Sequence, residues 1–244
     1  MRRMPALLLS LLLTFAAAAD DSLKRARIEA NLVTTVAIEG VAGPSLLEQM
    51  RELGVPAVSY AIIENGRVVT AVAHGVADLQ SGRPATPDTL FQAASISKPV
   101  TAMAVLDLVE EGKLRLDDPV NSMLRSWRLP ENELTAATPV TLRLLLSHSA
   151  GTTVHGFPGY AIDAPRPTLA QILSGEPPAN TVAVQVDLAP DTKFRYSGGG
   201  TTLAQAVLID RSGLTFPELM RRTVLGPLGM RSSVRAAASS STAA

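Results

Sequence analysis

The stretch Phe91-Gln92-Ala93-Ala94-Ser95-Ile96-Ser97-Lys98-Pro99 places a serine three residues before a lysine. The chain has four lysines, and only this one follows a serine at that spacing. On a helix, residues i and i+3 share a face, with their Cβ atoms about 5–6 Å apart. The spacing therefore predicts an amine beside a hydroxyl, and a lysine that loses its proton readily can activate such a serine as a nucleophile.

A helix is expected to continue from this serine to about Glu111. Its apolar residues recur at the spacing of one helix face, and they are Ala102, Val105, Leu106 and Val109. Gly112 suits the position after the helix, where left-handed backbone is common. Pro99 is tolerated because backbone donors in the first turn have no helical partners. Ser95 then lies at a helix N-terminus, where the helix dipole favours developing negative charge.

Upstream of this helix, the sequence predicts a shorter helix and a β-hairpin. Residues 45–53 carry a helical apolar pattern, which Gly54 and Pro56 end. Residues 58–63 and 68–72 are rich in β-forming side chains. Asn65-Gly66 joins them and favours a type I′ turn, because both residues tolerate positive φ. Two strands alone are marginally stable, so the hairpin needs a further layer to pack on.

Downstream, the pattern predicts short helices separated by loops rich in proline and glycine. The expected helices are residues 141–148, 168–173, 203–211 and 216–224, with a turn at 149–151. The last residues are nearly all Ala, Ser and Thr. Such a composition cannot bury a core, so residues 234–244 are expected to form a disordered tail.

The composition argues against several classes of function. With 22 basic and 22 acidic residues the formal net charge is zero, so no nucleic-acid partner is indicated. The chain has no cysteine, which excludes disulfides, thiolate metal ligands and a cysteine nucleophile. The three histidines, His74, His148 and His155, lack metal-ligand spacing. We expect them to be structural, and we expect no metal or other cofactor.

The N-terminus has the pattern of a secretory signal. Arg2 and Arg3 precede an apolar run at residues 6–18, and Ala17-Ala18-Ala19 gives a small-residue cleavage site before Asp20. A transmembrane anchor is the alternative, but the run is shorter than the ~20 residues that a span needs. The pattern therefore predicts a signal peptide at residues 1–19, no stable membrane anchor after cleavage, and a periplasmic or secreted protein.

With these segments placed, the sequence resembles the serine β-lactamase-related family, which includes class C β-lactamases, D-Ala-D-Ala carboxypeptidases and related esterases. Five stretches occur in the order typical of that family. They are residues 91–98, 106–119, 144–151 (Leu-Leu-Leu-Ser-His-Ser-Ala-Gly), 194–197 (Phe-Arg-Tyr-Ser) and 227–230 (Pro-Leu-Gly-Met). A lone Ser-x-x-Lys is weak evidence, whereas five ordered stretches are strong evidence.

The resemblance implies three catalytic residues. Ser95 would be the acylated nucleophile, Lys98 would ease its deprotonation, and Tyr196 would accept or relay the proton. A tyrosine has an ordinary pKa of about 10 and needs a neighbouring cation to act as a base at neutral pH. Taken singly, the same residues could be a helix cap, a surface lysine and a core aromatic. His148 is assigned a structural role in the turn before Gly151, because Lys98 already fills the base position.

The chain departs from the family pattern at two places. Where lactamases have Tyr-x-Asn, this chain has Tyr196-Ser197-Gly198, and Gly198 has no amide to hold a substrate carbonyl. The later Lys-Thr-Gly or His-x-Gly motif of the family does not occur in the chain. The resemblance therefore implies a C-terminally truncated member, with the hydrolase domain at residues 20–233 incomplete.

These inferences combine into one expectation of fold and function. The fold is α/β and β-lactamase/transpeptidase-like, an antiparallel sheet packed by helices, with a helical subdomain at residues 118–189 and the C-terminal strands missing. The function is that of a secreted serine hydrolase with a Ser95 acyl-enzyme, acting on a small-molecule or peptide substrate: a β-lactam, an ester or a D-amino-acid amide. Two alternatives stay open: an esterase or D-amino-acid peptidase rather than a lactamase, and an inactive fragment that only binds ligand.

Overall fold

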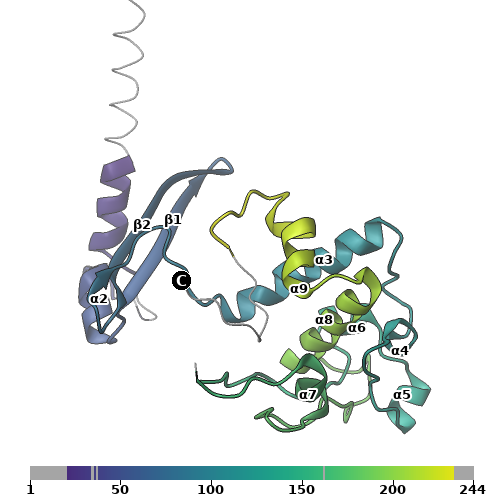
Figure 1. The fold of residues 1–244 in the computed structure, drawn as a ribbon. Helices are drawn as coiled ribbons and strands as arrows, with labels where there is room; N and C mark the ends of the chain where they lie inside the picture. Colours follow the sequence, from purple (N-terminus) through teal and green to yellow (C-terminus); the bar gives the residue numbers. More distant parts are fainter. Residues whose placement is uncertain (1–20, 34–35, 37, 162, 234–244) are drawn as a thin grey trace, which may run out of the picture. The chain divides into compact units, whose positions relative to one another are not determined.

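The computed structural model describes residues 21–33, 36, 38–161 and 163–233. The chain divides into two compact units, Met1–Phe91 and Gln92–Ala244, which are described separately below (Figure 1). The predicted signal peptide and the predicted tail lie outside the described residues. Within the described residues, no helix combines the length and the apolar character needed to cross a membrane.

The first unit is built around an antiparallel sheet in the order β1-β2-β3. Its strands are β1 (Ala57–Glu64), β2 (Arg67–Asp78) and the short β3 (Arg83–Pro84). The predicted turn is confirmed, since Asn65 and Gly66 both have positive φ, at 51° and 74°. Helix α2 (Leu46–Glu52) precedes the sheet, and Ser45 caps it through a capping box with Glu48. The predicted helix and hairpin are therefore present, with β2 running six residues beyond the predicted strand.

A helix at residues 21–30 lies against one face of this hairpin. The Glu29 carboxylate accepts a hydrogen bond from the Tyr60 hydroxyl at 2.5 Å and lies 2.8 Å from His74 Nε2. Arg25 donates to the same oxygen at 2.8 Å. Tyr60 and His74 share a face because Val58 pairs with His74 and Tyr60 with Val72. One carboxylate thus connects the helix to both strands.

The second unit is helical. Its elements are a 3₁₀ turn (Ala94–Ile96), α3 (Ser97–Glu110), α4 (Val120–Met123), α5 (Glu133–Ala137), α6 (Leu142–Leu146), α7 (Leu169–Ser174), α8 (Gly198–Ser212), α9 (Phe216–Met220) and a π-helical turn (Arg221–Leu225). Helix α8 is the centre of the unit and contacts α3, α4, α6, α7 and α9. Leu203, Val207 and Leu208 of α8 are fully buried, so this helix supplies much of the core.

The predicted helices of this unit are confirmed in position but not in every boundary. Helix α3 buries Thr101, Ala104, Val105 and Leu108, whereas Leu106 of the predicted stripe is 50% exposed. Each buried position therefore lies one residue before the predicted position, and the spacing between the positions is the same. Helix α8 begins at Gly198, five residues before the predicted start. The region 118–189 carries four short helices, of which α4 and α5 were not predicted. An antiparallel sheet and packed helices agree with the predicted α/β class.

Candidate active site

Ser95 lies in the 3₁₀ turn that leads into α3, and its side chain is exposed. The preceding residue, Ala94, has a positive φ of 42°. A residue with a Cβ costs roughly 1–2 kcal/mol in left-handed backbone, so the local chain is strained where it presents Ser95. Such strain is common where structure holds a functional side chain in place.

Lys98 lies one turn further along α3 and faces Ser95. Its Nζ donates to Ser95 Oγ at 3.1 Å. The predicted i, i+3 pairing of amine and hydroxyl is therefore present in the structure. A cation at this distance stabilises negative charge that develops on the serine oxygen.

Tyr196 reaches the same hydroxyl from a segment 101 residues away in sequence. Its hydroxyl donates to Ser95 Oγ at 2.7 Å, and Lys98 Nζ lies 4.6 Å from the centre of its ring. Hydrogen bonding with Lys98, and then with Ser95, lowers the pKa of Tyr196 below its ordinary value of 10.0. The three predicted residues are thus brought together, and the phenol is shifted towards the ionised form that can accept a proton.

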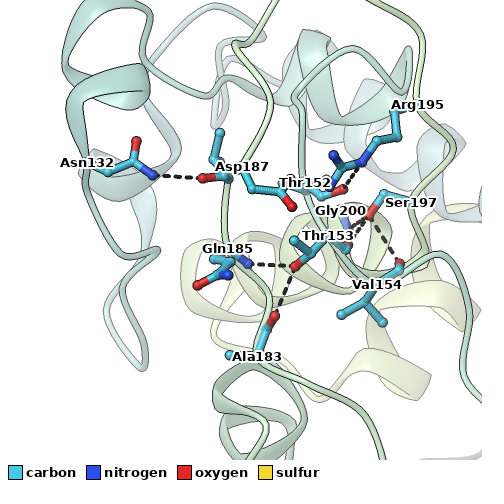
Figure 2. A network of polar contacts seen from close by, with 11 residues as sticks. Asn132, Thr152, Thr153, Val154, Ala183, Gln185, Asp187, Arg195, Ser197 and Gly200 are labelled. Atoms are coloured by element: carbon cyan, nitrogen blue, oxygen red, sulfur yellow. Dashed lines mark hydrogen bonds and ion pairs between the residues drawn. The ribbon is translucent and has the colours of Figure 1, made fainter.

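Tyr196 is held by the chain that leads into α8. Ser197 caps this helix, and its Oγ accepts from Gly200 N at 2.9 Å and donates to Thr153 O at 2.7 Å (Figure 2). On the other side of Tyr196, Arg195 Nε donates to Thr152 O at 3.2 Å, and its guanidinium pairs with Asp187. The residues on both sides of the tyrosine are therefore tied to the loop that follows α6.

The glycines that follow Tyr196 allow the loop backbone to approach the first turn of α8. Gly198 N donates to His155 O at 3.0 Å, and Gly199 N donates to Val154 O at 2.9 Å. A Cβ on Gly199 would lie 2.7 Å from Thr153 O. The run Gly198-Gly199-Gly200 is entirely buried. Close packing therefore explains the glycines. Because they have no Cβ, the loop backbone can lie directly against the first turn of α8, next to Tyr196.

Two histidines from this loop contact the Tyr196 ring. The ring centres of His148 and Tyr196 are 4.6 Å apart, and those of His155 and Tyr196 are 4.9 Å apart. The pKa of His148 lies below its ordinary value of 6.5, first because of burial and second because of the Lys98 charge. His148 occupies a turn, as expected, with a φ of 56°. The described residues contain no group of three or more His, Cys, Asp or Glu arranged to hold a metal ion.

Comparison with known proteins gives the family of the chain. The family model described as Beta-lactamase matches residues 40–241, a span that contains every residue of the site. The chain belongs to the beta-lactamase family. Among solved structures, the octameric penicillin-binding protein homologue from Pyrococcus abyssi matches with a TM-score of 0.61 and 32% identity, covering 76% of this chain and 42% of that one. The chain thus has the fold of this family over about three quarters of its length.

Curated members of the beta-lactamase family that resemble the chain include several hydrolases. Esterase EstB from Burkholderia gladioli is 39% identical over 105 residues, which are 43% of this chain and 26% of the esterase. The D-aminopeptidase of Gluconobacter oxydans (strain 621H) is 30% identical over 190 residues, which are 75% of this chain and 33% of that enzyme. The chain therefore spans less than half the length of these relatives.

Sequence reasoning identified the serine, the lysine and the tyrosine, but not the ring contacts of the histidines. His148 was assigned to a turn, and His155 was given no place in the site. A usable signal was present for His148, because it lies in one of the five ordered stretches. No pattern in the sequence pointed to His155, whose contact depends on how the loop folds back.

Proposed function

We propose that the protein is a serine hydrolase that works through an acyl-enzyme on Ser95. One observation carries the proposal: Ser95 Oγ accepts hydrogen bonds from both Lys98 Nζ, at 3.1 Å, and the Tyr196 hydroxyl, at 2.7 Å. A serine hydroxyl is a poor nucleophile until a base removes its proton. A phenol with a lowered pKa beside an ammonium group supplies that base.

The chemistry follows from these contacts. Tyr196, as a phenolate, takes the proton from Ser95, and Oγ forms a bond to the carbonyl carbon of the substrate while the carbonyl electron pair moves to its oxygen. Lys98 stabilises the charge that passes between the two oxygens. When the tetrahedral intermediate collapses, the bond to the leaving group breaks and Tyr196 returns the proton to it. Water then repeats the sequence and releases the acid.

Esters and D-amino-acid amides are the proposed substrates, in preference to cephalosporins. A Cβ on Gly198 would lie 3.1 Å from His155 O and 3.2 Å from Phe157 Cε2. This position therefore has little room for a side chain that could hold a substrate carbonyl. The names of relatives include an esterase, a D-aminopeptidase and a D-amino acid amidase. They also include beta-lactamases, so the preference rests on Gly198. One missing hydrogen bond is worth about tenfold in rate, so the preference is modest.

The proposed place of action is the periplasm or the exterior of the cell. The support is the sequence pattern at residues 1–19, with its basic start, apolar run and small-residue cleavage site. N-terminal sequencing of protein recovered from outside the cytoplasm would give a chain that starts near Asp20. Recovery of full-length chain in the cytoplasm alone would contradict this part of the proposal.

The central experiment is labelling of the full chain with a fluorophosphonate probe, followed by peptide mapping. We expect the label on Ser95 and its loss in Ser95→Ala. Ser147→Ala is the matched control, because Ser147 Oγ lies 2.7 Å from Ser149 Oγ and is not part of the group formed by Ser95, Lys98 and Tyr196. Label on another serine while Ser95 stays free would overturn the proposal.

Turnover assays on the same preparations separate hydrolysis from ligand binding. A p-nitrophenyl ester and a D-amino-acid p-nitroanilide are compared with a chromogenic cephalosporin. Faster turnover of the cephalosporin would contradict the proposed substrates. Stoichiometric labelling of Ser95 without any turnover would show a reactive serine in a protein that does not hydrolyse these substrates, which would overturn the proposed hydrolase activity.

A further inference from the structure

His148 holds the chain on both sides of Tyr196. Its backbone oxygen accepts a hydrogen bond from Arg195 N at 2.7 Å. Its imidazole Nδ1 accepts from Ser197 N at 3.3 Å. Its ring also lies against the phenol, with ring centres 4.6 Å apart and an angle of 37° between the planes. His148 therefore accepts hydrogen bonds from the backbone N–H groups of the residues on both sides of Tyr196, and it contacts the Tyr196 ring itself.

The hydrogen bond from Ser197 N defines the protonation state that this arrangement requires. A backbone N–H only donates, so Nδ1 must be the unprotonated nitrogen of a neutral ring. Protonation of Nδ1 would place two donors face to face. It would also add a positive charge near Lys98, the charged group that already disfavours the imidazolium form.

The other charged and titratable groups around His148 come from three segments. Lys98 comes from α3, Tyr196 and Arg195 precede α8, and His155 belongs to the loop that contacts the same phenol. The Arg195 guanidinium is turned towards Thr152 O and Asp187. The Phe194 ring meets His148 edge-on, at 5.8 Å between centres. The Asp187 carboxylate pairs with Arg195. Burial and the Lys98 charge disfavour a proton on His148, whereas the ionised form of Tyr196, in ring contact with it, would favour one.

We propose that His148 is a positioning residue for Tyr196: its neutral imidazole holds the Ser197 peptide so that the phenol reaches Ser95, and its protonation releases that hold. The inference rests on the proposed function, in which Tyr196 takes the proton of Ser95. It also gives the site a second dependence on pH. The first comes from Tyr196, which must be ionised to act as a base, and the second from His148, which must be neutral.

Two substitutions separate this role from that of a simple turn residue. In His148→Asn the amide oxygen can replace Nδ1 as acceptor without titrating, and asparagine tolerates positive φ. His148→Leu keeps apolar bulk but has no acceptor, so it leaves the Ser197 N–H unpaired. His155→Asn is the control. The His155 ring also contacts the Tyr196 ring, but the residue bonds to Gly198 N through its backbone oxygen, which the substitution keeps.

The first readout is the rate of Ser95 labelling by the fluorophosphonate as a function of pH. In the wild type and in His155→Asn, we expect the rate to fall more steeply at some pH below 6.5, because His148 as well as Tyr196 must then be deprotonated. His148→Asn should keep a neutral-pH rate within a few-fold of the wild type and lose the steeper region. His148→Leu should be about tenfold slower, the usual effect of one hydrogen bond on a rate.

The second readout does not require a working enzyme. The chain has three tyrosines, so ¹³C-labelled tyrosine gives a simple NMR spectrum that can be followed against pH. We expect the Tyr196 ring signal to show an inflection below pH 6.5 in the wild type and none there in His148→Asn. The same inflection in both proteins, or an unchanged steep rate profile in His148→Asn, would overturn the inference. If Ser95 is never labelled but the inflection behaves as expected, the proposed function fails while the link between His148 and Tyr196 stands.

Discussion

At the scale of single residues, the Lys98 ammonium interacts with two oxygen atoms, Ser95 Oγ and the Tyr196 hydroxyl. We predict that Lys98→Met, which keeps the side-chain length without the charge, raises the pKa of Tyr196 back towards 10. Because the proposed function needs Tyr196 in its ionised form, the acid limb of the rate profile should move to higher pH. The labelling rate at neutral pH should fall by about 10²–10⁴.

The control for this change is Lys113→Met. Lys113 forms an exposed ion pair with Glu111 and is not one of the proposed site residues. Both variants are compared by labelling rate between pH 6 and 10. An acid limb that stays in place in Lys98→Met would show that Tyr196 does not depend on this charge.

We predict that Tyr196→Phe abolishes most of the activity but leaves the fold intact. The phenylalanine keeps the ring that contacts His148 and His155, while the hydroxyl that is proposed to accept the serine proton is removed. A loss of about 10²–10⁴ in labelling rate is expected, with an unchanged thermal midpoint. Tyr160→Phe, whose hydroxyl accepts from Asn180 N at 3.3 Å, is the matched control. Equal rates in the two variants would argue against a catalytic tyrosine.

The sequence predicted part of this site and missed the rest for a physical reason. The pairing of Ser95 and Lys98 is local, since helix geometry alone places i and i+3 side by side. Tyr196 is 101 residues away from Ser95, and only the resemblance to a family made it a candidate. The contacts of His155 depend on loop geometry, which no local pattern encodes.

At the scale of elements, the first turn of α8 packs closely against the loop that follows α6. We predict that Gly199→Ala destabilises the protein, because the new Cβ would lie 2.7 Å from Thr153 O, a backbone atom that cannot move aside easily. Overpacking of this kind typically costs about 1–3 kcal/mol. Alanine is better than glycine in a helix by about 1 kcal/mol, which offsets only part of that cost.

Gly156→Ala provides the comparison, since a Cβ at Gly156 would meet no atom within 4 Å. Urea unfolding followed by far-UV circular dichroism measures both variants. We expect a lower midpoint for Gly199→Ala and an unchanged one for Gly156→Ala. A midpoint for Gly199→Ala at or above that of the wild type would mean that the loop is not closely packed on α8.

A prediction for the first unit concerns Glu29. Burial raises the pKa of Glu29, but hydrogen bonds from Tyr60, His74 and Arg25 outweigh it and lower the pKa from 4.5 to about 2. A carboxylate with a depressed pKa contributes stability that is present above the unfolded value and lost as the pH falls through the folded value. This contribution, on the order of 3 kcal/mol, should therefore disappear between about pH 4.5 and pH 2.

Glu29→Gln should lower the stability at neutral pH by this amount, and the stability of the variant should change less between pH 4.5 and pH 2 than that of the wild type. Hydrogen exchange of the amides at residues 21–30 and in β1 and β2 gives the local stability. Arg27→Gln is the control, because Arg27 is exposed on the same helix. Equal protection in Glu29→Gln and the wild type at pH 7 would contradict the role of this carboxylate in fastening the helix to the sheet.

The elements themselves were predictable to different degrees. The hairpin followed from Asn65-Gly66, whose positive φ values are a local property of those residues. The start of α8 was placed too late because three consecutive glycines have low helix propensity. Close backbone packing stabilises that turn instead, and this is a tertiary effect. Helices α4 and α5 have four and five residues, which is too short to produce an apolar period.

At the scale of the whole molecule, the proposed site belongs to a single unit. Ser95 and Lys98, the loop after α6, and Tyr196 with α8 all lie within Gln92–Ala244. The contacts that position the nucleophile are therefore internal to the helical part of the chain. The overall α/β class was predicted through the resemblance to the family. Division into two compact units was not predicted, because the pattern of each element carries no information about how elements group.

The position of the phenol beside Lys98 also makes the tyrosines of this protein chemically unequal. Aryl sulfonyl fluorides react with phenolates, so a tyrosine with a lowered pKa is attacked before one with a raised pKa. Tyr196 is of the first kind, whereas burial and the neighbouring Glu29 raise the pKa of Tyr60 to about 12. At pH 8 such a reagent should modify Tyr196 before Tyr60, as peptide mapping would show. Covalent inhibitors of this protein could therefore be aimed at Tyr196, its proposed base, and they need not resemble any substrate.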